Sequence, residues 1–107
     1  RDEGSFRDLT EEQLAVLKER AVPVPEVVVT TPVRLDNPER LTVPVTAICT
    51  AFSAEEYRQA AEAGVPYFAD MPNYENLTYV DLSTGHWPMW SKPEELAAIL
   101  LQAGEAR

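Results

Sequence analysis

The sequence predicts an α/β fold in which strands and helices alternate, and whose parallel sheet is incomplete on its own. Two short runs rich in β-branched and aromatic residues, 43–49 and 77–82, have the length and composition of strands. Each is followed by a capping-box pattern, Ser53–Glu56 and Ser91–Glu94, so a helix follows each strand. A strand–helix–strand unit pairs its strands in parallel, and parallel sheets need several strands and cover on both faces. We therefore expect the strand–helix–strand–helix end of a larger sheet.

The first 40 residues predict one helix followed by an extended linker. Thr10 and Gln13 form a capping box, and the helix must end before Pro23. Its apolar positions follow at helical spacing: Leu14, Leu17 and Ala21. Val27–Val33 is rich in β-branched residues, but Pro25 and Pro32 bracket it, which predicts an extended linker or an edge strand.

The helix after the first strand is expected to end at Gly64, a natural left-handed position. Residues 65–76 hold two prolines and predict a loop. In the last helix, Ser91 is expected to be the N-cap, with Pro93 in the first turn. The stripe that this helix should bury consists of Leu96, Ile99, Leu100 and Ala103.

Length and charge limit the possible functions. A chain of 107 residues allows one small domain, and 45% hydrophobic with 25% charged residues is ordinary for a soluble globular protein. The formal net charge of -9 disfavours nucleic acids and anionic membranes as partners, because both bind basic surfaces. A single cysteine excludes an internal disulfide, so we expect a cytoplasmic protein. No apolar run spans a bilayer and no secretory signal is visible, and the start at Arg1 suggests a piece of a longer protein.

No cofactor is expected. One histidine and one cysteine cannot form a structural metal site, and the chain contains no glycine-rich phosphate loop. Cys49 lies in an apolar strand and is interpreted as a small hydrophobic residue.

One turn combines unusual residues. Gly85-His86-Trp87-Pro88 follows the second strand and precedes the helix that begins Ser91-Lys92-Pro93-Glu94. Together with the earlier Pro44-Val45 strand, these segments resemble, over residues 41–102, the C-terminal part of α/β-hydrolase-fold proteins. The residues before 41 resemble, more weakly, the exit from that family's helical cap. The resemblance thus divides the chain into a cap exit and linker, 1–40, and the C-terminal βαβα part of a hydrolase core, 41–107.

The resemblance implies that His86 occupies the place of the catalytic histidine, which takes a proton from a serine and returns it to the leaving group. Gly85 would allow a sharp turn and leave room for substrate. Trp87 would line an acyl pocket or pack under the last helix.

Two departures from the family pattern concern the rest of the catalytic machinery. No Gly-x-Ser-x-Gly turn occurs, so the nucleophile must lie outside this chain, which alone should be inactive. The aspartate that the family often places after the first of these strands is replaced by residues 50–53. Three acids stay open: Glu55, Asp81, or an acid upstream of Arg1, which we rank first.

Three functions therefore compete. The whole protein could be an esterase-like hydrolase of a small acyl substrate, with His86 as general base. The chain could instead be a non-catalytic half-domain that acts by associating with a partner, either the N-terminal half of the same protein or a second copy. The scaffold also hosts lyases, dehalogenases and transferases. A serine between glycines upstream of Arg1 would favour the hydrolase, and an aspartate in its place a dehalogenase.

Overall fold

A pair of parallel strands organises the chain. The computed structural model describes residues 4–105, in which β1 (Val45–Cys49) pairs with β2 (Leu77–Asp81). The register runs from Val45 opposite Leu77 to Cys49 opposite Asp81, so both strands end at the same edge. The two predicted strands and their parallel pairing are confirmed.

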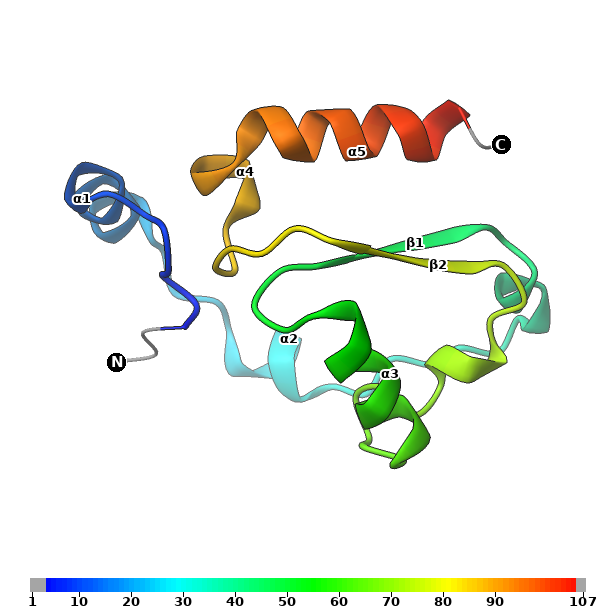
Figure 1. The fold of residues 1–107 in the computed structure, drawn as a ribbon. Coiled ribbons are helices and arrows are strands. Elements are labelled where there is room, and N and C mark those ends of the chain that lie inside the picture. Colours follow the sequence, from blue (N-terminus) through cyan, green and yellow to red (C-terminus); the bar gives the residue numbers. More distant parts are fainter. Residues whose placement is uncertain (1–3, 106–107) are drawn as a thin grey trace.

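Helices lie on both sides of this strand pair (Figure 1). The chain passes from β1 to β2 through α3 (Ala54–Glu62), and from β2 through α4 (Pro88–Ser91) into α5 (Pro93–Glu105). Figure 1 shows α5 along one side of the strands and α3 along the other. The α/β class and the strand–helix–strand–helix order are therefore confirmed.

The start of α3 explains why this helix forms where it does. Ser53 and Glu56 make the predicted capping box, in which Glu56 accepts a hydrogen bond from the Ser53 amide at 2.7 Å. Asp81 Oδ1 accepts from the Ala54 amide at 2.7 Å, which ties the helix start to the end of β2. The helix is followed by Gly64 at φ 70°, the left-handed position that was predicted.

The buried core of the described residues is small. Its apolar members are Cys49, Ala54, Ala61 and Leu82. Only Cys49 of β1 is buried. Two strands with one helix on each face leave the strand edges and part of both faces open.

The N-terminal part differs from the prediction in one element. α1 (Glu11–Arg20) starts with the predicted capping box of Thr10 and Gln13. The expected extended or edge-strand segment instead contains a single helical turn, α2 (Glu26–Thr30), and no strand pairs with it in the described residues. Glu26, an acidic residue in its first turn, favours a helix start, and no strand edge pairs with this segment in the described residues. Two short 3₁₀ helices complete the chain, η1 (Pro38–Leu41) and η2 (Met71–Asn73), the latter inside the predicted loop.

The last helix departs from the prediction at its start and on its inner face. Ser91 is the final residue of α4, and Lys92, at φ -142°, separates α4 from α5. The Ser91 hydroxyl bonds with Thr84 at 2.6 Å, so the predicted role as N-cap is wrong. The expected buried stripe is only half-buried, and Leu100 is 56% exposed, because only two strands lie beneath α5.

Candidate functional site

The turn that carries His86 begins where both strands end. The Leu82 amide donates to the Cys49 carbonyl at 2.8 Å, so the turn leaves β2 beside the end of β1. His86 is exposed, and its ring meets the Trp87 ring edge-on with centroids 5.5 Å apart. Within residues 4–105 the imidazole makes no side-chain hydrogen bond. The histidine is therefore presented at the carboxyl edge of the sheet with its ring nitrogens accessible.

A hydroxyl pair inside the turn fixes its shape. Thr84 is fully buried, and its hydroxyl lies 2.6 Å from the Ser91 hydroxyl. Ser91 also bonds with the Trp87 carbonyl at 3.3 Å. Gln13 of α1 donates its side-chain amide to the Trp90 carbonyl at 2.9 Å, which attaches α1 to α4. The turn is thus braced from within and from the N-terminal helix.

The N-terminal segment 4–8 lies directly against this turn, beside the strand ends (Figure 1). The His86 amide donates to the Ser5 carbonyl at 2.8 Å. The Arg7 guanidinium donates to the Thr84 carbonyl at 2.7 Å through Nη2. The sequence pattern did not predict this contact, because no local signal links residues almost eighty positions apart.

Gly85 is needed for the close approach of segment 4–8, and not for an unusual backbone conformation. Its φ lies outside the left-handed region, which among the described glycines only Gly64 adopts. A Cβ at Gly85 would lie 2.6 Å from the Arg7 carbonyl oxygen and 2.7 Å from the Ser5 carbonyl oxygen. The space that the sequence assigned to substrate beside this glycine is occupied by main-chain atoms.

Trp87 is half-buried between His86 and the start of α4. Its Nε1 is buried and has no hydrogen-bond partner in the described part of the chain. An unpaired buried donor costs stability, because the group has lost its hydrogen bonds to water.

Glu55, Asp81 and Glu56 are the acids close to the ends of the strands, and each has a partner other than His86. Glu55 is exposed, accepts from Gln59 at 2.9 Å, and lies 3.7 Å from Arg58, both on its own helix. Asp81 caps α3, as described above. Hydrogen bonds from Ser53 lower the pKa of Glu56, which keeps this carboxylate charged in the capping box. None of them contacts the His86 ring.

Side chains that could act as nucleophiles are also engaged. Burial, and secondarily the charge of Asp81, raise the pKa of the Cys49 thiol, which is 1% exposed. A raised thiol pKa disfavours a reactive thiolate. The hydroxyl of Ser53 bonds with Glu56 and that of Ser83 accepts from Arg7 at 3.4 Å. None of these three side chains forms a hydrogen bond with His86.

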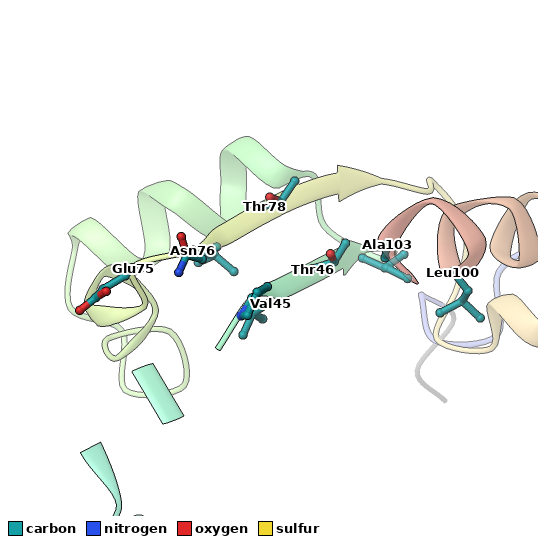
Figure 2. A pocket seen from close by; sticks show the side chains of 10 residues that line it. Val45, Thr46, Glu75, Asn76, Thr78, Leu100 and Ala103 are labelled. Atoms are coloured by element: carbon teal, nitrogen blue, oxygen red, sulfur yellow. The ribbon is translucent and has the colours of Figure 1, made fainter. Parts of the chain in front are cut away.

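A sizeable cavity lies away from the His86 turn. A cavity of ≈ 570 Å³ opens between α5 and the amino-terminal halves of the strands (Figure 2). Figure 2 shows Leu100 and Ala103 of α5 on one side and Thr46 and Thr78 of the strands on another. Parallel strands place their amino ends opposite their carboxyl ends, so this cavity lies away from the His86 turn.

No cluster of three or more histidine, cysteine or acidic side chains suited to a metal ion occurs in residues 4–105. Across the same range, no helix is both long enough and apolar enough to cross a bilayer.

Comparison of the chain with known protein families, curated proteins and solved structures finds no match.

Proposed function

We propose that this chain is the C-terminal part of an α/β-fold hydrolase, esterase-like, with His86 as general base and the serine nucleophile outside the chain. The observation that carries the proposal is the placement of His86, exposed on the turn directly after β2 and beside the end of β1. In open parallel sheets, ligands bind at the carboxyl ends of the strands. A histidine held there can take a proton from a serine and return it to a leaving group.

The surroundings of the turn support this chemistry. A general base must keep its ring in one place relative to the reacting atoms. The Thr84–Ser91 hydroxyl pair and the Ser5 carbonyl hold the main chain on both sides of His86, while the ring stays exposed.

The open strand edges and exposed apolar side chains of this chain indicate what a partner would cover. Each strand has one neighbour in the described residues, and α5 leaves Leu100 and Leu101 56% and 70% exposed. Open strand edges and apolar faces promote association. We propose that the N-terminal half of the same protein, or a second copy, covers them, and that residues 1–40 are the exit from a cap. The substrate would be a small acyl compound and the location cytoplasmic, since Cys49 is a free thiol.

A non-catalytic half-domain is the second candidate. It is favoured by the two acid candidates of this chain, Glu55 and Asp81, whose carboxylates have partners other than His86, and by the N-terminal segment, which fills the space beside Gly85. In this alternative the turn would stabilise an interface and would carry out no proton transfer.

Aryl ester hydrolysis by the native protein separates the two candidates. We expect His86→Ala to lower turnover by about a thousandfold or more, as loss of a triad member does. Met89→Ala is the control, because Met89 is 51% exposed and lies next to the same turn. Near-full turnover in His86→Ala would refute the assignment of His86. A native protein that is inactive on esters but binds a second chain tightly would favour the half-domain.

A further inference from the structure

A single guanidinium connects the N-terminal segment to the ends of both strands. Arg7 Nη2 donates to the Thr84 carbonyl at 2.7 Å and to the Thr50 carbonyl at 3.3 Å, and lies 3.4 Å from the Ser83 hydroxyl oxygen. Thr50 follows β1 directly, whereas Ser83 and Thr84 follow β2. The Thr50 carbonyl also accepts from the Thr84 amide at 3.4 Å, so the two segments stay paired just beyond the strands, and the guanidinium adds a charged donor to both carbonyls. Arginine, which carries five N–H groups and no acceptor, is well suited to supply such donors.

The segment that carries Arg7 is itself held in one conformation. Ser5 accepts from the His86 amide on one side of Arg7. The Leu9 amide donates to the Phe6 carbonyl at 3.3 Å and closes the turn around Arg7, and Asp8 has φ 68°, a left-handed conformation that aspartate adopts more readily than most residues. The close approach at Gly85 leaves no space for this segment to slide past the turn. Main-chain hydrogen bonds at Ser5 and at Phe6–Leu9 thus hold the segment on either side of Arg7.

We propose that Arg7 is a positioning residue, which holds the turn bearing His86 in one conformation against the carboxyl ends of β1 and β2. The effect on the turn stands on the contacts above, and its consequence for catalysis rests on the proposed function. Arg7 binds the carbonyl two residues before His86, and the neighbouring Ser5 binds the His86 amide. Without the guanidinium, two strand-end carbonyls lose a charged donor, and the turn would open locally.

Hydrogen exchange of the His86 amide tests the positioning role. In Arg7→Ala we expect this amide to exchange about tenfold or more faster, since a hydrogen bond to a charged group is lost next to it. The amides of β2 report opening of the whole sheet and should change far less. Arg7→Lys should restore most of the protection, because a single Nη2 atom makes the contacts and an ammonium can replace one donor atom.

The matched control is Arg34→Ala, which removes the same charge from an exposed position in the segment after α2. Its His86 amide should exchange as in the unmodified chain. Unchanged protection of His86 in Arg7→Ala, or an equal acceleration of the β2 amides, would overturn the proposal.

Kinetics of the native protein separate this proposal from the proposed function. If both hold, Arg7→Ala lowers kcat about tenfold or more with little change in KM, because a misplaced base affects the reaction and not ground-state binding. Faster His86 exchange in a native protein without esterase activity would leave Arg7 as a positioning residue and reject the hydrolase. A lowered kcat with unchanged His86 exchange would reject the positioning role and retain the hydrolase.

Discussion

Replacing Gly85 with alanine would push a methyl group into main-chain atoms of the N-terminal segment. The new Cβ would lie 2.6 Å from the Arg7 carbonyl oxygen, 2.7 Å from the Ser5 carbonyl oxygen and 2.9 Å from the Arg7 nitrogen. Main-chain atoms cannot rotate away as a side chain can, so the segment must move. The movement weakens the His86–Ser5 and Arg7–Thr84 hydrogen bonds, of 2.8 and 2.7 Å. With about 1 kcal/mol for the neutral bond and roughly 1.5–3 kcal/mol for the charged one, we expect a loss of about 2–4 kcal/mol.

Urea unfolding at one fixed protein concentration, followed by tryptophan fluorescence, measures this loss. Two other glycines provide matched controls. Gly104 lies in α5 with nothing within 4 Å of its Cβ position, so Gly104→Ala should be neutral or stabilising by up to ~1 kcal/mol. Gly64 has the same open space but φ 70°, so Gly64→Ala should cost about 1–2 kcal/mol from the backbone alone. A Gly85→Ala chain as stable as Gly104→Ala would refute the close approach of the two segments.

Three further predictions concern the acids and the assembly. Glu55→Gln should change ester turnover by far less than the roughly 10⁴-fold loss that follows neutralisation of a triad acid, because Glu55 pairs with Gln59 and Arg58. A large loss of turnover with an unchanged unfolding midpoint would instead identify Glu55 as the catalytic acid. Hydrogen bonds from Asn73, and secondarily Arg40, lower the pKa of Asp70 in the folded chain. The stability that Asp70 contributes is therefore fully present above its unfolded pKa, near 4, and is lost as the pH falls from there through the lower folded pKa. The free energy of unfolding of Asp70→Asn should lack this loss in acid unfolding. The 107-residue chain should sediment as a dimer or larger species, because its strand edges and apolar faces are open, and a monomer with a sharp cooperative melt would contradict this.

Local patterns predicted the elements well where the signal lies within a few residues. The capping boxes at Thr10 and Ser53 join residues three positions apart, so the residue types specify them. The left-handed conformation of Gly64 likewise follows from the residue itself and its place after a helix. Ser91 shows the limit of this reasoning. Its sequence context matches an N-cap, but its hydroxyl is taken by the buried Thr84, which lies on the other side of the turn.

The surroundings of His86 depended on contacts that no local pattern encodes. The glycine before His86 predicted free space, and that space is filled by Ser5 and Arg7 from the other end of the chain. Asp81 lay in a strand whose side-chain directions could not be assigned from sequence, and the fold places it at the start of α3. The position of the turn at a strand end was predictable from its neighbours in sequence, whereas its partners followed only from the fold.

Covalent labelling of the native protein with a fluorophosphonate, read by peptide mass spectrometry, tests most directly whether His86 acts as a general base. A fluorophosphonate reacts with a serine whose proton is taken by an adjacent base. We predict one labelled serine outside residues 4–105, with a labelling rate that falls about a thousandfold in His86→Ala and is unchanged in Met89→Ala. A native protein that takes no label, or one labelled equally fast with and without His86, would contradict the assignment.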